Sequence, residues 1–290
     1  MSDELPDFDA LWDYDDPEES ERRFRELLPA AKIAGDDAYQ LQLLTQIARA
    51  QGLQRQFDVA HRTLDSVETR RIGQPLADIR YLLERGRVYN SSGQPEKACE
   101  HFLDAWDKAI AAGEDFFAVD AAHMLGIAAP PDDRLDWNLR ALSLARSSEH
   151  PAARRWQGSL FNNIGWTYHD REQYEDALAM FEDALAWREE QNQPTEILIA
   201  RWCIARALRS LGRIDEALAM QEELLEIHRE AGSSDGYVSE EIGECLLALD
   251  RADDARPYFA DAYAALSKDT WLMANDRARL ERLHRLSGED

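Results

Sequence analysis

The chain has 290 residues, and its 57 acidic and 33 basic side chains give a formal net charge of −24. A surplus of this size repels phosphate backbones, so we expect no nucleic-acid partner. There is no apolar run of about 18 residues to span a membrane, and the acidic N-terminus is not a signal peptide. Three scattered cysteines suggest neither disulfides nor a zinc site. We therefore expect a cytoplasmic protein that needs no metal or cofactor.

Residues 1–19 form an acidic tail. The tail carries nine acidic residues, interspersed with Phe8, Trp12 and Tyr14. A segment with this charge cannot bury a core of its own, so we expect it to be disordered. Its aromatic side chains leave two interpretations open. The tail is a solubilising segment, or it is a short linear motif for a basic partner or for an arginine-lined groove of the same protein.

The rest of the chain repeats one pattern of small and large apolar residues six times, with a period of 38 to 40 residues. Each repeat has a small or short polar anchor residue, at Ala60, Ala98, Asn138, Ala177, Ala217 and Ala255. A second small residue precedes each anchor by twelve positions, at Ala48, Gly86, Gly126, Gly165, Ala205 and Gly243. Apolar residues recur at helical spacing around both positions, which predicts two amphipathic helices per repeat. We expect the small residues to lie where the two helices cross, and larger residues such as Phe181 to fill the space between successive pairs.

The predicted elements follow in chain order as one domain over residues 20–290. A half-repeat helix over residues 20–34 precedes the first pair, and a capping helix over residues 270–287 follows the last. The six repeats between them cover residues 41–70, 79–112, 118–149, 157–191, 196–231 and 236–267. Gly93 and Gly212 each precede an anchor by five residues, where a residue with positive φ ends the first helix. The third repeat departs from the pattern, because Pro130-Pro131 stops its first helix and Asn138 replaces the anchor alanine.

The fourth repeat, with Gly165, Tyr168, Ala177 and Phe181, resembles the tetratricopeptide repeat family. The resemblance extends over residues 39–268, although the repeats are longer than the family's 34 residues and most lack its closing proline. Long variants of this kind look like arrays in bacterial regulators and adaptor proteins. The resemblance implies an all-α, right-handed α-solenoid of about six helix pairs.

In this family the first helix of each pair lines a concave groove, and the residues 15, 14 and 11 positions before the anchor point into it. From these positions we take eight candidate binding residues: Arg49, Arg87, His123, Asn162, Asn163, Trp166, Trp202 and Arg206. Arginine forks and amides suit carboxylates and peptide groups, and tryptophan and arginine are frequent binding hot spots. Alternatively, the arginines are solvated or pair with acids of a neighbouring helix, and His123 is a polar residue on a helix face. The last repeat places three carboxylates in the groove, at Glu240, Glu241 and Glu244.

The chain has no phosphate-binding loop, zinc-protease motif, nucleophile elbow or dinucleotide fingerprint, so we expect no catalytic residues. We expect a non-enzymatic adaptor that binds a peptide or a partner helix in its groove. The alternative is a peptide-responsive regulator, in which the ligand tightens the superhelix. Some quorum-sensing receptors act in this way, but they usually carry an effector module for which this chain has no room. The identity of the partner and the oligomeric state are left open.

Overall fold

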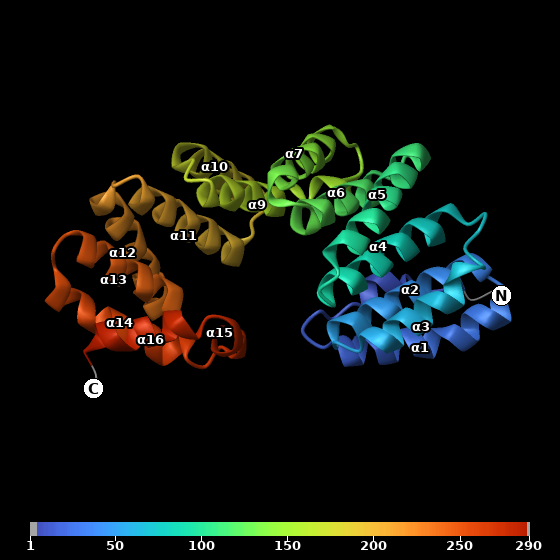
Figure 1. The fold of residues 1–290 in the computed structure, drawn as a ribbon, viewed down its shortest axis with the longest axis horizontal. Helices are drawn as coiled ribbons and strands as arrows, with labels where there is room; N and C mark the ends of the chain where they lie inside the picture. The colour runs from blue at the N-terminus through green and yellow to red at the C-terminus, as the bar shows by residue number, and fades with distance from the viewer. Residues whose placement is uncertain (1–4, 289–290) are drawn as a thin grey trace. The chain divides into compact units, whose positions relative to one another are not determined.

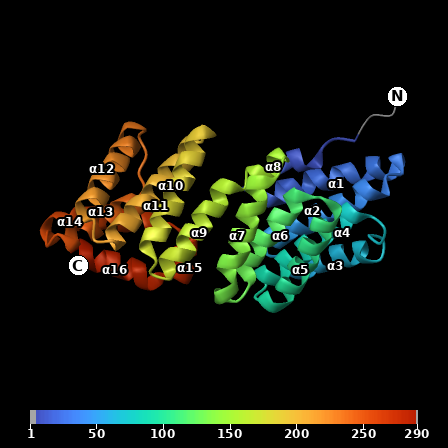
Figure 2. The ribbon, with the colours of Figure 1, turned by 90° about the horizontal axis from the view of Figure 1, so that it is seen from above.

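The computed structural model describes residues 5–288, which form helices and turns without any strand in that range (Figures 1 and 2). The contacts divide the chain into two compact units, unit 1 up to Leu160 and unit 2 from Phe161, where the sequence predicts one continuous domain. The elements have the following bounds: η1 Phe8–Leu11, α1 Pro17–Ala34, α2 Asp37–Leu53, α3 Phe57–Glu68, α4 Pro75–Ser91, α5 Pro95–Ala112, α6 Asp115–Ala128, α7 Pro131–Ser147, α8 Pro151–Arg154, α9 Gln157–Asp170, α10 Tyr174–Glu190, α11 Pro194–Ser210, α12 Ile214–Glu230, α13 Gly236–Ala248, α14 Ala252–Leu266, α15 Thr270–Asn275 and α16 Arg277–Ser287.

The helices confirm the predicted all-α solenoid of helix pairs. The six repeats correspond to α2–α3, α4–α5, α6–α7, α9–α10, α11–α12 and α13–α14. Within unit 1, α2 contacts both α3 and α4, and Figures 1 and 2 show these helices side by side. The first helices of successive pairs also touch, since α4 contacts α6, and α11 contacts α13 in unit 2. Each unit therefore has a layer of first helices against a layer of second helices, with the core between them.

A glycine in the first helix faces a phenylalanine ring of the second helix within the same pair. This contact forms between Gly86 and Phe102, Gly165 and Phe181, and Gly243 and Phe259. A Cβ atom built on any of these glycines would lie less than 3.0 Å from the ring, and all three rings are fully buried. The sequence places Phe181 between successive pairs, whereas the structure places it inside its pair. The glycine is thus required by the ring that covers it.

In the third repeat a polar side chain, and not a phenylalanine ring, packs on the glycine of the first helix. A Cβ on Gly126 would lie less than 3.0 Å from the side chain of Asn138, the residue that replaces the anchor alanine. Asn138 is buried, and its Nδ2 donates a hydrogen bond to the carbonyl oxygen of Arg134 at 3.1 Å. The asparagine therefore fills the space above its glycine, and its amide N–H has a hydrogen-bond partner while its buried Oδ1 has none among the described residues.

Five of the first helices end at the same turn, five residues before the anchor. Gly93 and Gly212 have φ values of 81° and 77°, which confirms the prediction for both. Non-glycine residues occupy the equivalent positions in three other repeats and take the same left-handed conformation: Arg55, Glu172 and Asp250, with φ between 58° and 61°. In the third repeat α7 already begins at Pro131, so this turn is missing.

The C-terminal cap differs from the single helix predicted over residues 270–287. The chain forms two helices there, α15 and α16, separated at Asp276. The Asp276 side chain accepts a hydrogen bond from the backbone N–H of Arg279 at 3.3 Å and caps the start of α16. Because α16 packs on α14, it covers the end of the unit 2 core as a capping helix should.

The predicted disorder of the tail is wrong for residues 5–19, while residues 1–4 lie outside the described range. Residues 8–11 form η1, and α1 begins at Pro17. Phe8 is only 6% exposed and packs with Phe24 of α1 and Leu43 of α2. The tail is too charged to form its own core, but it buries an aromatic side chain in a core that α1 and α2 provide.

The glycine–phenylalanine contact makes a testable prediction. We expect Gly165→Leu to lower the free energy of unfolding by about 1 to 3 kcal/mol, or more, because the new side chain meets the Phe181 ring. Gly52→Ala is the matched control, since a Cβ there meets only Val88 at 3.5 Å. We expect this control to be neutral or stabilising. Denaturant unfolding followed by circular dichroism measures both, and an equal loss in the two variants would contradict the explanation.

The shared turn makes a second prediction, with opposite signs at equivalent positions. Gly212→Ala should lower the free energy of unfolding by about 1 kcal/mol, because the left-handed backbone conformation is strained for alanine and not for glycine. Asp250→Gly should raise it by a similar amount, because the strain is relieved without changing the turn. Thermal unfolding of the two variants measures the effects. Shifts of the same sign would show that backbone conformation does not control these positions.

Candidate functional site

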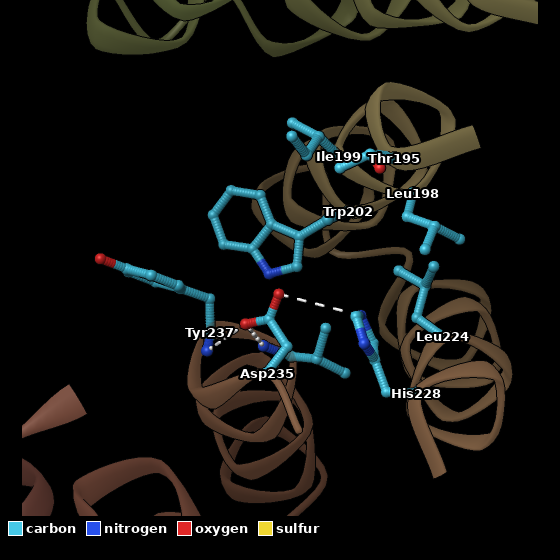
Figure 3. Close-up of a pocket in the computed structure, with 9 residues that line it drawn as sticks. Thr195, Leu198, Ile199, Trp202, Leu224, His228, Asp235 and Tyr237 are labelled. Atoms are coloured by element: carbon cyan, nitrogen blue, oxygen red, sulfur yellow. Dashed lines mark hydrogen bonds and ion pairs between the residues drawn. The ribbon is translucent and has the colours of Figure 1, made fainter. Parts of the chain in front are cut away.

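Unit 2 contains a pocket between α11, α12 and α13, with a volume of about 380 Å³ (Figure 3). Nine residues line it: Thr195, Leu198, Ile199 and Trp202 of α11, Leu224 and His228 of α12, and Asp235, Tyr237 and Val238 at the start of α13. The volume falls within the range of small-ligand pockets, so it can receive one large side chain or a small molecule.

Most of the pocket wall is apolar. Leu224 and Val238 are buried and belong to the core of unit 2, so they form a firm base. Ile199 lies at the rim, 53% exposed. Trp202 and Tyr237 contribute two aromatic rings, 6.3 Å apart between centroids and nearly perpendicular at 78°. The pocket therefore combines a rigid apolar base with an exposed apolar rim, which suits an apolar group of a ligand.

One side of the pocket is polar. Oδ1 of Asp235 accepts hydrogen bonds from the backbone N–H groups of Tyr237 at 2.8 Å and Val238 at 3.4 Å, which caps α13. Oδ2 lies 3.9 Å from Nε2 of His228. The Trp202 indole N–H is buried without a hydrogen-bond partner among the described residues, and Figure 3 shows it on the Asp235 side. An unpaired buried donor costs about 1 to 3 kcal/mol, so a ligand acceptor that reached it would stabilise the complex.

Trp166 and Trp202, both predicted as binding residues, lie next to each other. Their ring centroids are 6.0 Å apart, with 40° between the planes. Trp166 also packs on the buried ring of Phe181 at 5.3 Å and against His169 at 5.2 Å. Trp202 lines the pocket and Trp166 does not. The structure therefore gives Trp166 a packing role beside Phe181 and leaves Trp202 as the tryptophan that faces a cavity.

The two asparagines predicted as binding residues belong to α9 and form hydrogen bonds within unit 2. Oδ1 of Asn162 accepts a hydrogen bond from the Cys203 thiol at 3.4 Å. The backbone carbonyl of Asn163 accepts one from the Thr167 hydroxyl at 2.8 Å. Neither asparagine lines the pocket, so their role in peptide recognition stays a prediction.

Arg206 follows the alternative in which an arginine pairs with an acid of a neighbouring helix. Its Nε lies 3.3 Å from Glu241 of α13, and its Nη1 donates to the Ser210 hydroxyl at 2.6 Å. Glu241 also accepts hydrogen bonds from Arg209 at 2.7 and 3.0 Å. Burial lowers the pKa of Arg206, although Glu241 opposes this shift. The charge of Arg206 is thus largely compensated inside unit 2.

The three carboxylates predicted to face a groove are all in ion pairs. Besides Glu241, Glu240 accepts hydrogen bonds from Arg279 of α16 at 2.6 to 3.1 Å, and Glu244 pairs with Arg282. Each of the three carboxylates is therefore neutralised by an arginine of the scaffold. These acids join α13 to α11 and to the capping helix α16.

In unit 1, Arg87 and His123 are also engaged with the scaffold. Arg87 donates to Glu84 at 2.6 Å and to Asp120 of α6 at 2.5 Å. Burial works against ionisation of Asp120, but the charge of Arg87 prevails and lowers its pKa. His123 packs on Trp156 with ring centroids 4.8 Å apart, and burial lowers its pKa, which favours the neutral imidazole. These contacts agree with the structural alternatives for both residues.

Arg49 differs from the other predicted arginines in what surrounds it. Its guanidinium lies 5.5 Å from the ring centroid of Trp12 and 5.3 Å from that of Tyr14, so residues of the N-terminal tail cover it. Glu84 lies 3.8 Å away. The eight predicted residues therefore fall into two sets: Arg49, Arg87 and His123 in unit 1, and the remaining five in unit 2.

The sequence interpretation missed most of the pocket, because it used only three positions of each first helix. Ile199 and Tyr237 both lie 18 residues before their anchors, one helical turn ahead of the positions considered. The same position holds Arg80 and Asp120 in unit 1, where both are buried. Including this position would have identified these residues. His228 and Leu224 belong to a second helix, and no pattern in the first helices could indicate them.

Two thiols of unit 2 are shielded from water and from reaction. Burial raises the pKa of the Cys203 and Cys245 thiols to about 12, so both remain protonated and unreactive near neutral pH. In the described part of the chain, no three His, Cys, Asp or Glu side chains are grouped to hold a metal ion. None of the described helices has the length and apolar character needed to cross a membrane.

Solved structures show which fold this is. The apo form of RapI matches with a TM-score of 0.72 at 15% identity, covering 98% of this chain and 82% of RapI. The apo form of the quorum sensor NprR from B. thuringiensis matches with a TM-score of 0.67 at 17% identity, covering 96% of this chain and 78% of that chain. NprR in complex with its cognate peptide NprX matches with a TM-score of 0.58 at 18% identity, covering 97% and 83%. At these identities the likeness concerns the fold alone.

Sequence comparisons agree with the repeat pattern. A search of the curated proteins finds no match. Two family models of the tetratricopeptide repeat match this chain, one over residues 158–190 and the other over residues 196–268. These ranges include the fourth, fifth and sixth repeats, which carry the glycine–phenylalanine contacts of unit 2 and the pocket. The fourth, fifth and sixth repeats are therefore tetratricopeptide repeats, and the rest of the chain shares their fold.

Proposed function

We propose that this protein is a non-enzymatic adaptor, and that the pocket between α11, α12 and α13 receives an apolar side chain of a bound peptide or partner helix. The tetratricopeptide fold supports a role in protein interaction. The observation that carries the finer proposal is the pocket, with its buried base and the exposed Ile199 at its rim. Aromatic side chains such as Trp202 are typical of binding hot spots when a partner excludes water from them.

The polar side of the pocket favours a peptide over a purely apolar ligand. Oδ2 of Asp235 can accept a hydrogen bond, and the indole N–H of Trp202 can donate one. A peptide backbone carries both complementary groups, an N–H and a carbonyl, next to each side chain. We therefore expect a ligand whose large apolar residue enters the pocket while its own backbone pairs with Asp235 and Trp202.

Selection from a random phage-displayed peptide library, followed by fluorescence anisotropy with a selected peptide, tests this proposal. We expect Ile199→Glu to weaken binding at least about tenfold, because a carboxylate replaces apolar surface at the rim and repels Asp235. Ile110→Glu is the matched control, since Ile110 is 46% exposed but lies on α5 in unit 1. We expect its affinity to equal that of the wild type.

Both substitutions replace an exposed isoleucine on a helix, so we expect both to change the unfolding free energy by less than about 0.5 kcal/mol. Equal losses of affinity in the two variants would indicate a charge effect without a site. Undiminished affinity in Ile199→Glu would place the peptide elsewhere and refute the pocket.

A peptide-responsive regulator is the second candidate. It is supported by the fold shared with NprR, whose structure holds its cognate peptide and overlaps 97% of this chain. The two functions differ in what the peptide does to the protein. Small-angle X-ray scattering with and without a selected peptide separates them. A regulator changes its radius of gyration on binding, whereas an adaptor holds the peptide without such a change.

A further inference from the structure

The N-terminal tail crosses unit 1 on a surface formed by first helices. We call residues 7–14 the docked segment, and we call Tyr39, Gln46, Arg49 and Arg80 the docking surface. Three of these surface residues belong to α2 and Arg80 belongs to α4. Gln46 and Arg49 occupy positions that the repeat pattern assigns to the groove, so the segment lies where a tetratricopeptide-repeat protein is expected to hold a ligand.

The first half of the docked segment places a ring and a carboxylate on Arg80. Phe8 is buried edge-on against Tyr39, with ring centroids 5.1 Å apart. Both carboxylate oxygens of Asp9 accept hydrogen bonds from Arg80, one of them at 3.0 Å. The guanidinium lies 5.2 Å from the Phe8 ring and 4.9 Å from the Phe117 ring. The segment therefore provides Arg80 with an aromatic face and a two-pronged carboxylate, the geometry that a guanidinium recognises best.

The second half places two stacked rings beside Arg49. The rings of Trp12 and Tyr14 are 4.8 Å apart and nearly parallel, at 1°. The Arg49 guanidinium lies within 5.5 Å of both ring centroids, which is within the range of cation–π contacts. The indole N–H of Trp12 donates a hydrogen bond to Oε1 of Gln46 at 3.1 Å, and Gln46 is 1% exposed. Polar side chains of the scaffold thus contact both the carboxylate and the aromatic rings of the segment.

Arg80 depends on the segment for its counter-charge. Other buried arginines of unit 1 pair with acids of the repeats, as Arg85 does with Asp65 at 2.6 Å. In the described range of residues, the carboxylate in an ion pair with Arg80 is Asp9 of the tail. Without the segment, Arg80 would keep its position beside Phe117 and lose its acid. An arginine in that state favours any ligand that brings a carboxylate and an aromatic ring together.

The segment can leave its surface without disturbing the repeats beneath it. Phe8 is its buried anchor, whereas the Tyr14 side chain is 57% exposed and the Asp9 side chain 45% exposed. Leu11 and Trp12 are half-buried and add to this anchor, but the segment is a short terminal stretch, so opening it costs less than global unfolding. The α1–α2 core keeps Phe24 and Leu43 when Phe8 leaves, so opening the segment does not require the scaffold to unfold.

We propose that the docking surface is a binding site for acidic-aromatic peptide segments of partner proteins, and that residues 7–14 occupy it as an internal ligand that such a segment displaces. The recognised chemistry is an aromatic residue followed directly by an aspartate, with a tryptophan three positions later. The site lies in unit 1 and does not depend on the function proposed for the unit 2 pocket.

A labelled peptide with the sequence of residues 5–16 is the probe, and fluorescence anisotropy with the full-length protein is the measurement. In Phe8→Ala/Trp12→Ala the internal ligand loses its anchors and the surface becomes free. We expect this variant to bind the probe at least about tenfold more tightly than the wild type. Adding Arg80→Gln should remove at least that gain, because the probe's aspartate loses its partner. Adding Arg140→Gln instead is the matched control, since Arg140 pairs with Asp136 on α7, and should leave the gain intact.

The outcomes separate the alternatives. An absence of gain in Phe8→Ala/Trp12→Ala with unchanged circular dichroism would overturn the proposal, and so would equal binding of a probe with scrambled sequence. If that variant loses helicity, Asp9→Asn opens the segment by removing one charge, and a gain below about threefold would then refute it. Dimerisation of the wild type that Phe8→Ala abolishes would show that the segment occupies a second copy, which contradicts internal docking. Ile199→Glu should leave probe binding unchanged, so failure of the unit 2 proposal is read separately.

Discussion

The packing of a phenylalanine ring onto a glycine of the facing helix is the constraint on which the rest of each unit depends. In the pairs that contain Gly86, Gly165 and Gly243, the ring occupies the volume where a side chain would start. This contact sets the rotation of the first helix about its own axis, because only one face has room for the ring. Once that face is turned inward to the pair, the residues 18, 15, 14 and 11 positions before the anchor lie together on one adjoining side of the helix, about 60° to 160° around its axis from the glycine. The position of the surface that we propose to face a ligand is thus a consequence of the core.

Ion pairs between arginines and carboxylates connect the first helices along that surface. The net charge of the protein gives no indication of them. Arg87 of α4 reaches Asp120 of α6, and Arg209 of α11 reaches Glu241 of α13. Both pairs join first helices of successive repeats, and both are largely shielded from water, where charge pairs interact more strongly than on an open surface. The basic side chains of the first helices therefore serve mainly to connect repeats. Arg80 and Arg49 stand apart, because their closest aromatic partners include residues of the tail.

Much of the fold could be predicted from the sequence, because the two helices of a pair are close together in the chain and their packing shows in the pattern of one repeat. Small residues twelve positions apart and glycines such as Gly93 report packing and turns within one repeat. The identity of the acid that pairs with Arg206, Glu241, could not be predicted, since it depends on how two repeats stack. Docking of the tail on its own protein was left open for a related reason: composition shows that the tail has no core, but it says nothing of the core that Phe24 and Leu43 offer to Phe8. The pocket was not predicted, because part of its wall comes from a second helix.

The short connection between the docked segment and α1 has a consequence for any competitor. Only residues 15 and 16 separate Tyr14 from Pro17, the first residue of α1. A ligand held by so short a tether faces its site at an effective concentration in the millimolar range. A free peptide of equal affinity would have to approach that concentration to occupy half of the sites. On our proposal the tail therefore raises the affinity that a partner needs. A partner occupies the surface of α2 and α4 only if it binds more tightly than the tail does, or if it also holds the protein at a second point.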